Sequence, residues 1–569
     1  MPVPAFKLPH PGNTPNQLLI CWKSYKSYST NCWRFALSWR AAGLEIEASS
    51  DNPVMFLKAA SLSLALLIAS RLLGLVRESA QAAALGATGL ADVAVLMLTL
   101  PDWLAGLLAS GALAYVLLPA WAHADPAAVR QMQRKVARVL LAGGVGLGLL
   151  LALAVGLAPE ATLEALAPGL PPALVSAATQ GLLFSAIALP AALLAALWAT
   201  RLQHEQDFVG LYAANLVVNG VLIAALLLVA SRADSTRATA LLGTGLLLAM
   251  GLRLGWLMYR QRRLNLALSQ PSQPSPASAV PLSMTPLPAP SLWLWAALSA
   301  GLPLALPFVA RSLASQQGEG ALTMFNYAWK LVELPLVLAI QLVASLAFPG
   351  IARAFATGPK SADQQPDNQR MTQPVTQAFA LAWTLACAAA AALLTGAPAI
   401  AKLLFGWGRM PEEALAQIAQ WGAAGAWGLL PQALMAVALT VLAAQSRMRV
   451  AVLAFAVALT LLVVLGTQYP LGGLQLMWLL NALYAGVALV CVAAAVGGRA
   501  GLLRQWLPVC NLVVPLLVLL VLVALQRGLT LPIYDQNMAF ALMKSAGAAI
   551  VLIVISVSFS GDLRRALKR

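Results

Sequence analysis

Charged residues are scarce in this sequence. Only 10% of its 569 residues are Asp, Glu, Lys or Arg, whereas 60% are hydrophobic and the mean hydropathy is +0.79. This balance excludes an ordinary soluble domain and is typical of a chain that crosses a membrane many times. The composition therefore predicts an all-α, polytopic membrane protein.

Residues that usually carry catalysis or bind metals are also rare. There are only three histidines, they are scattered, and no metal-ligand spacing occurs. No Gly-Lys-Ser or Gly-Lys-Thr is present, so the chain lacks the phosphate loop of an ATP-driven transporter. The five cysteines form no disulfide pattern, and the acidic pair Glu412 and Glu413 is interpreted as a solvated helix start. We expect no catalysis, no cofactor and no metal.

Apolar runs of about twenty residues, the length that spans a bilayer, number fourteen. They lie near Phe56–Ala84, Ala91–Trp121, Val136–Leu157, Leu174–Thr200, Phe208–Ala230, Ala238–Tyr259, Leu292–Ala314, Leu322–Ala354, Val375–Leu394, Ile418–Ala444, Val450–Leu465, Leu474–Val496, Trp506–Leu525 and Met538–Phe559.

A proline- and serine-rich segment interrupts this series after the sixth run. It is too polar to lie in a membrane and is expected to be a flexible cytoplasmic connector. Six runs on each side of it suggest two lobes with a cavity between them. The predicted divisions are a leader (1–54), an N-lobe (55–268), the linker (269–290), a C-lobe (291–500), and two further spans with a basic cytoplasmic tail (501–569).

The leader has a mixed composition without the apolar region of a signal peptide. The first apolar run begins directly after Met55, in Met55-Phe56-Leu57-Lys58. We therefore expect translation to begin at Met55.

Lys and Arg residues divide unevenly between the loops when the runs are threaded alternately across a membrane. If the first run starts in the cytoplasm, most basic residues fall on that side. The opposite side collects Arg232, Arg237, Lys402, Arg409 and Arg527. Because cytoplasmic loops are enriched in Lys and Arg, both ends of the bundle are predicted to be cytoplasmic. The net charge of +16 then reflects orientation rather than a nucleic-acid partner.

Two arginines interrupt the first apolar run, in the segment SRLLGLVRE at 70–78. A guanidinium at membrane depth is costly and usually faces a wet cavity, a counter-charge or an anionic substrate. The six-residue spacing separates Arg71 and Arg77 by roughly 120° around a helix and about 9 Å along it, so both are expected to border one broad cavity. The simpler alternatives are snorkelling toward the interface or a structural pair with Glu78.

Several motifs together carry a family resemblance. The segment 70–78 is followed by LGA at 85–87, Ala91-Asp92 and Leu100-Pro101, and later by Asn215, YAWKLVELP at 327–335 and LFGWG at 404–408. In order and spacing this pattern resembles the MurJ/MviN lipid II flippases, and the likeness covers essentially everything from Met55 onward.

The resemblance implies a member of the multidrug/oligosaccharidyl-lipid/polysaccharide exporter superfamily, with a cationic cavity between two lobes and a polyprenyl-diphosphate-linked sugar as substrate. Arg71, Arg77 and Asp92 match positions of functional residues in that family, and Lys330 stands where an arginine is usual. Arg71, Arg77 and Lys330 are therefore predicted to bind the diphosphate, since cations, and arginine forks above all, suit phosphate oxygens.

One stretch departs from the family pattern. An arginine usually follows the Leu-Pro pair of the second span, but this sequence reads LAGL at 104–107, and Ser110 replaces an acidic residue. Arg253 in the sixth run and Arg311 in the seventh are candidates to restore positive charge. Packing or interfacial positions are the alternative for both.

The acidic candidates are predicted to act in gating or structure. Asp92 lies near the start of a run, where an N-terminal helix-dipole or capping role and a gating contact with Arg77 are both open. Lys330 and Glu333 are three residues apart, so a mutual ion pair would explain both without a substrate.

The sequence thus predicts a bacterial inner-membrane flippase that moves lipid II, the undecaprenyl-diphosphate-linked peptidoglycan precursor, by alternating access. Its partners would be this lipid-linked precursor and the bilayer, with envelope-synthesis proteins also considered. Without an ATPase, the membrane potential or an ion gradient would drive transport. The alternatives are a flippase for another polyprenyl-diphosphate glycan such as an exopolysaccharide or O-antigen unit, a drug exporter, and a non-transporting scaffold.

Overall fold

The computed structural model describes residues 53–107, 111–122, 124–230, 234–268, 289–356, 368–497, 500–528 and 538–567. The chain divides into two compact units, Met1–Ala60 and Ser61–Arg569, and the packing below concerns the second. Almost all of the predicted leader and linker lies outside the described residues, as does Ser110. The predicted domain divisions therefore stay predictions.

The described residues form helices joined by short turns, without a strand among them. Their bounds are α2 (Pro53–Leu85), α3 (Gly89–Leu107), α4 (Leu113–Ala122), α5 (Pro126–Leu157), α6 (Pro159–Leu166), η3 (Pro172–Leu174), α7 (Val175–His204), α8 (Phe208–Val229), α9 (Ser235–Leu268), α10 (Pro290–Ala314), η4 (Ser315–Gln317), α11 (Ala321–Pro335), η5 (Leu336–Ile340), α12 (Gln341–Ala356), α13 (Asn368–Phe405), α14 (Glu412–Ala426), α15 (Leu429–Ala444), α16 (Met448–Gln468), α17 (Gly473–Val496), α18 (Ala500–Trp506), α19 (Val509–Gly528), α20 (Met538–Phe559) and α21 (Gly561–Leu567).

The all-α membrane class is confirmed. Within the described ranges, eleven helices are long and apolar enough to cross a membrane, and the pair α14–α15, bent by 47°, adds a twelfth. Each of the fourteen predicted runs falls on one helix or on consecutive helices. The first run falls on α2, which carries three charged residues between 70 and 78, and the second run falls on α3 with α4. These three helices are not among the twelve.

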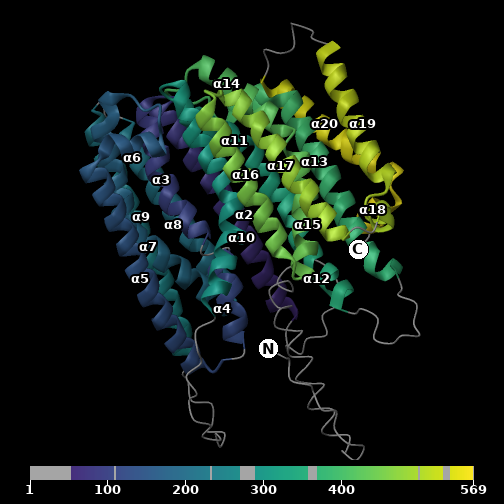
Figure 1. Cartoon of the computed structure of the whole chain (residues 1–569), viewed down its shortest axis with the longest axis horizontal. Helices are drawn as coiled ribbons and strands as arrows, with labels where there is room; N and C mark the ends of the chain where they lie inside the picture. Colours follow the sequence, from purple (N-terminus) through teal and green to yellow (C-terminus); the bar gives the residue numbers. More distant parts are fainter. Residues whose placement is uncertain are drawn as a thin grey trace, which may run out of the picture. The chain divides into compact units, whose positions relative to one another are not determined.

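The helices α3 to α9 pack around α7, whose small residues allow close approach. In Figure 1 they lie on the left, in purple to blue. A Cβ added at Gly144 of α5 would lie 2.8 Å from the Cα of Pro190, and one at Gly148 would lie 2.6 Å from the carbonyl oxygen of Ala186. Glycine is therefore required where α5 crosses α7, because a side chain would separate the two helices.

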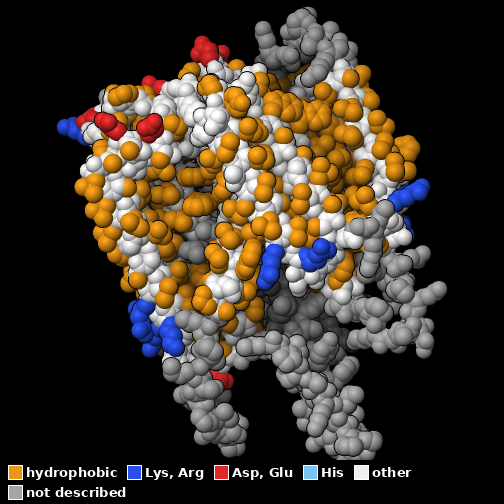
Figure 2. Space-filling model, in the orientation of Figure 1, with side chains coloured by type: hydrophobic (Ala, Val, Ile, Leu, Met, Phe, Trp, Pro, Cys, Tyr) orange, Lys and Arg blue, Asp and Glu red, His pale blue; other side chains and the backbone are white. Residues whose placement is uncertain are grey.

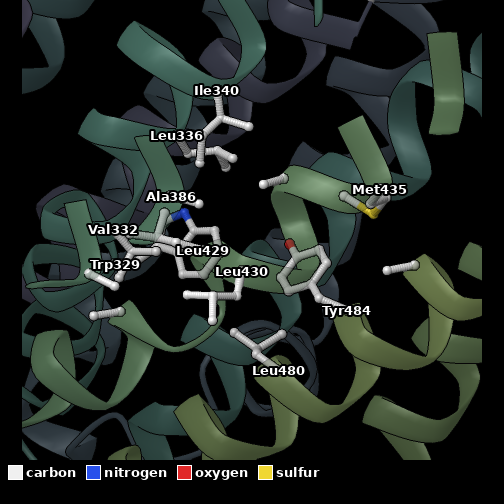
Figure 3. Close-up of a cluster of buried hydrophobic side chains, with 14 of the residues drawn as sticks. Trp329, Val332, Leu336, Ile340, Ala386, Leu429, Leu430, Met435, Leu480 and Tyr484 are labelled. Atoms are coloured by element: carbon white, nitrogen blue, oxygen red, sulfur yellow. The ribbon is translucent and has the colours of Figure 1, made fainter. Parts of the chain in front are cut away.

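The helices α10 to α20 share one large hydrophobic core around the long helix α13. Figure 3 shows part of it, where Trp329 and Leu336 meet Leu429 and Tyr484. The Trp329 and Tyr484 rings stack with centroids 6.1 Å apart. Several smaller cores hold α3 to α9 together. Each group of helices thus has interior packing of its own, and we call α2 to α9 the N-lobe and α10 to α21 the C-lobe below.

Charge and apolar surface are segregated along the bundle. On the face drawn in Figure 2, apolar side chains form a broad band, Lys and Arg gather mainly toward the end that bears α4, and Asp and Glu gather mainly toward the end that bears α14. An apolar band between polar ends is typical of a protein whose sides contact lipid. These two ends are called the α4 end and the α14 end below.

Candidate functional site

A cavity of about 290 Å³ lies between α2, α3, α8 and α9 on one side and α11 with η5 on the other. It is lined by charged residues from several elements. Its cations are Arg71, Arg77, Arg253 and Lys330, and its carboxylates are Glu78, Asp102 and Glu333. Most of the predicted site residues therefore meet at one place, although they are up to 262 positions apart in the sequence, from Arg71 to Glu333.

Helix α2 contributes both arginines that interrupt the first apolar run. Arg71 and Arg77 both line the cavity, as the helical spacing predicts, together with Gly74 between them. Helix α8 lies close to α2 here, and a Cβ at Gly74 would make an ordinary contact with the side-chain amide nitrogen of Asn219, 3.7 Å away.

Arg77 is held by two carboxylates. Its guanidinium donates to Glu78 at 2.7 Å and to Asp102 at 3.2 Å, and only 14% of its side chain is exposed. The pairing with Glu78 is thus present in this conformation. Asp102 of α3, which the sequence does not single out as a site residue, is the second partner and joins α2 to α3.

Lys330 and Glu333 form the mutual pair considered from their spacing. The Lys330 ammonium lies 2.8 Å from a Glu333 carboxylate oxygen, one turn along α11. Two of the four cavity cations, Lys330 and Arg77, are therefore neutralised by neighbouring carboxylates.

Arg71 and Arg253 differ from these two. Neither has an Asp or Glu within ion-pair distance in the described part of the chain. Arg71 lies on α2 and Arg253 near the middle of α9. The positive charge that is available to an anion in this cavity is concentrated on these two guanidinium groups.

Helix α8 supplies neutral hydrogen-bonding groups to the same wall. Tyr212, Asn215 and Asn219 all line the cavity, and their spacing of three and four residues places them on one face of the helix. Polar groups of this kind on a lipid-embedded helix usually face a partner or a wet cavity. The spacing in an otherwise apolar run is the signal that would have identified Tyr212 and Asn219 from sequence.

Arg311 lies beside the cavity rather than in its lining. Its guanidinium donates to the carbonyl oxygen of Pro307 at 3.1 Å and to the side-chain oxygen of Asn326 at 2.8 Å. The amide of Asn326 in turn lies 3.4 Å from Glu78. In this conformation its side chain links α10, α11 and α2, and the role of Arg311 as a compensating cation stays a prediction.

The C-lobe wall of the cavity is partly apolar. It includes Leu334, Val337 and Leu338, which follow the Lys330–Glu333 pair. Pro335 has no N–H to continue the α-helical ladder, and the next five residues form the π-helix η5. A π-helical turn after a proline is a common device for redirecting side chains at functional sites.

Asp92 lies in the first turn of α3, as the helix-dipole alternative expects, but its hydrogen bonds reach the other lobe. Its two carboxylate oxygens accept hydrogen bonds from the backbone N–H groups of Gly320, at 2.7 Å, and Thr323, at 2.8 Å. It thus caps the start of α11 in the other lobe, and Arg77 is not its partner. Glu319 returns the contact by accepting from the N–H of Gly89, the first residue of α3, at 2.9 Å. Each lobe caps a helix of the other.

Glycines bring the two lobes into backbone contact at the same place. Gly320, with φ +81°, lies so close to Ala87 that an added Cβ would be 2.3 Å from its carbonyl oxygen. Gly408, with φ +65°, approaches the carbonyl oxygen of Ala83 equally closely, and the N–H of Arg409 donates to that oxygen at 3.0 Å. Residues 83–92, 319–323 and 406–409 are called the interlobe seal below. It joins the two lobes toward the α14 end, beyond the residues that line the cavity.

Contacts nearer the α4 end have a different character. Along α10, Phe308 stacks on Trp103 with ring centroids 5.7 Å apart, and Ala296 packs in a small cluster with Ala112 and Val116. These contacts between α10 and the α3–α4 segment are apolar, in contrast to the hydrogen-bonded seal.

The comparisons with known proteins agree with this arrangement. The profile described as lipid II flippase MurJ matches residues 81–545. The chain belongs to the lipid II flippase MurJ family. The resemblance found in the motifs is thereby confirmed, and Asp92, Arg253 and Lys330 lie inside the matched range whereas Arg71 and Arg77 precede it.

Two solved structures are similar in fold. A lipid II flippase MurJ in an inward closed conformation is 14% identical, with a TM-score of 0.65 over 89% of this chain and 100% of that one. An inward-facing MATE family transporter of the MOP superfamily is 14% identical, with a TM-score of 0.51 over 77% and 95%. A comparison with curated proteins gives no match. MurJ family membership and the many apolar helices identify a multi-pass membrane protein of a transporter family.

Proposed function

We propose that this protein translocates lipid II across the bacterial inner membrane by alternating access. The observation that carries the proposal is the charged cavity between the lobes of a MurJ family chain, in which four cations face three carboxylates. A cavity with an excess of positive charge is suited to the diphosphate of a lipid-linked precursor.

Arg71, Arg77 and Lys330 are proposed to bind the diphosphate in the course of transport. Guanidinium groups donate in pairs to phosphate oxygens, which makes them stronger ligands than isolated point charges. Arg77 and Lys330 are paired with carboxylates in this conformation, so their engagement would require an exchange of partners. A substrate-dependent exchange of this kind would couple binding to movement of the lobes.

The unequal ends of the cavity support alternating access. In the orientation predicted from the loop charges, the α14 end faces outward and the α4 end faces the cytoplasm. The interlobe seal then closes the outer side, and the apolar contacts of α10 lie toward the cytoplasmic side. This conformation would receive the precursor from the inner leaflet and would release it after the seal opens.

The driving force is proposed to be the membrane potential or an ion gradient. Moving one elementary charge through the field is worth about 2.3 kcal/mol per 100 mV. A cavity whose net charge changes on substrate binding would respond to that field. The partners would be the lipid-linked precursor and the surrounding bilayer, without a catalytic reaction.

The test is complementation of a bacterial strain depleted of its own lipid II flippase. The Met55-start protein should restore growth, whereas Arg71→Ala and Arg77→Ala should not, because each removes a cavity cation. Arg237→Ala is the matched control, since its side chain is 80% exposed and its ion pair among the described residues is with Asp234 at 3.4 Å. All variants are compared at equal membrane abundance.

Rescue by both arginine variants would contradict transport through the cationic cavity and would favour a scaffold role. Failure of the well-expressed parent protein would instead redirect the assignment to another polyprenyl-diphosphate-linked glycan.

A further inference from the structure

The four cavity cations fall into two classes. Arg77 contacts two carboxylates and Lys330 contacts one, all within 3.2 Å. Arg71 and Arg253 line the same cavity without an acidic partner in the described chain. An anion that enters therefore meets one guanidinium and one ammonium that already pair with carboxylates, and two guanidinium groups that do not.

Arg253 is the less expected of the unbalanced pair. It lies near the middle of the membrane-length helix α9, and its buried Nε has no hydrogen-bond partner among the described residues. The nearest acidic influence on Arg253 is Asp102, which is outside ion-pair distance and pairs with Arg77. A buried N–H without a partner is unfavourable. Since a packing role would be served better by an apolar side chain, an anionic ligand offers the missing partner.

The surroundings of Arg71 and Arg253 fit an oxyanion. The wall they share with α8 carries Tyr212, Asn215 and Asn219, whose hydroxyl and amide groups can donate hydrogen bonds. Glu78 and Glu333 are held by Arg77 and Lys330, and Asp102, which pairs with Arg77, is the one cavity carboxylate that also acts on Arg253. The N-lobe wall is thus both cationic and rich in donors.

We propose that Arg253 and Arg71 form the anion-binding pair that makes the first contacts with the diphosphate in this conformation, ahead of Arg77 and Lys330. This inference rests on the proposed function and adds a substrate-contact residue to it. Arg77 and Lys330 remain with their carboxylates at this stage and join only when the lobes rearrange.

The test measures equilibrium binding of undecaprenyl diphosphate to the full chain in nanodiscs of zwitterionic lipid. Arg253→Gln and Arg71→Gln should each weaken binding by about 10- to 100-fold, the range for losing a charge-assisted hydrogen bond. Arg253→Lys keeps the positive charge but loses the paired donors of the guanidinium group. Its affinity should lie between those of Arg253→Gln and the parent protein. Lys330→Gln, which removes a cation already paired with Glu333, should weaken binding less than Arg253→Gln does.

Arg260→Gln is the matched control on the same helix. Arg260 pairs with Asp207 through two hydrogen bonds at 2.7 and 2.9 Å and does not line the cavity. The Arg260→Gln variant should bind undecaprenyl diphosphate as tightly as the parent protein does. Two further readouts separate a ligand contact from a folding effect: Arg253→Gln should lessen the preference for undecaprenyl diphosphate over undecaprenyl monophosphate, and it should reduce the salt dependence of binding.

Parent-like affinity, phosphate preference and salt dependence in Arg253→Gln would overturn this inference while leaving the proposed function intact. Equal weakening in Arg260→Gln would also overturn it, because the effect would then be structural. Absence of saturable binding to the parent protein would reject the inference and the proposed function together.

Discussion

At the α14 end, the contacts between the two lobes are made to backbone atoms. Elsewhere the lobes meet through side chains. In the interlobe seal, carboxylates of Asp92 and Glu319 cap helices across the interface, and Gly320 and Gly408 lie against carbonyl oxygens. Around the cavity, by contrast, charged side chains pair, and along α10 rings and small apolar groups pack. The seal therefore depends on main-chain geometry, whereas the cavity depends on charge balance.

Because of this difference, the seal and the cavity should tolerate different substitutions. A backbone contact fixes the distance between two chains to a few tenths of an ångström, so any added side chain must force them apart. An ion pair inside a cavity can exchange partners when a new anion arrives. We expect steric changes to act most strongly on the seal and charge changes to act on substrate affinity.

The largest effect is expected for Gly320→Ala. Its Cβ would lie 2.3 Å from the carbonyl oxygen of Ala87, so the lobes cannot approach as they do here. Transport of lipid II in reconstituted vesicles should fall by more than about tenfold, roughly the effect of 1.4 kcal/mol or more on a closed state. Gly497→Ala is the control, because its φ is similar at +63° but the nearest atom, on Arg447, is 3.7 Å away. Equal losses in both variants would attribute the effect to backbone strain instead of collision.

A smaller effect is expected for Asp92→Asn. One of its two carboxylate oxygens becomes an NH2 group, so one of the bonds to Gly320 and Thr323 is lost. Weakening the seal by about 1 to 3 kcal/mol should shift the population toward states open at the α14 end. Spin labels at Arg237→Cys and Glu413→Cys, in a cysteine-free background, should report a longer distance distribution.

Glu319→Gln is the matched comparison for Asp92→Asn. Its amide keeps one acceptor oxygen for the single N–H of Gly89, so the distance distribution should stay close to that of the parent. A shift as large as that of Asp92→Asn would show that net charge, rather than the number of acceptors, holds the seal closed.

Much of the architecture could be predicted from sequence because its signals are local. The apolar runs predicted the positions of the membrane helices, in most cases to within a few residues. The breaks within α3–α4 and α14–α15 were not foreseen. The cavity residues Arg71, Arg77 and Lys330 were foreseen from the cost of charge in a membrane and from the family motif. Asp102 could not be singled out from local patterns, since its partner Arg77 is 25 positions away.

The seal could not be predicted, for a physical reason. Asp92 caps a helix that begins 229 residues later, at Ala321, and Glu319 caps α3 in return. Capping signals are read from the residues next to a helix start, whereas here each cap comes from the other lobe. Only the packing of the two lobes brings these carboxylates to the helix ends.

A modest gain in affinity is expected for Glu333→Gln. The carboxylate that now neutralises Lys330 at 2.8 Å is removed, so the ammonium becomes available to the diphosphate. Because both side chains are partly exposed to the cavity, at 26% and 37%, the gain should be about two- to threefold in undecaprenyl diphosphate binding. Unchanged or weaker binding would mean that the pair positions Lys330 for substrate instead of competing with it.

The smallest effect is expected outside both regions, at Glu412→Gln. Glu412 begins α14, its side chain is 87% exposed, and its only described ion pair is with Lys402 at 3.6 Å. The interpretation of Glu412 and Glu413 as a solvated helix start fits this position. Exposed pairs of this kind contribute about 0 to 1 kcal/mol, and Gln keeps a polar side chain in the first turn. Transport, diphosphate affinity and the spin-label distances should all match the parent protein, because the substitution changes neither the backbone contacts of the seal nor the charge of the cavity. A loss of transport without a change in abundance would show that this exposed position makes a functional contact. Transport would then depend on more than the backbone contacts of the seal and the charge of the cavity.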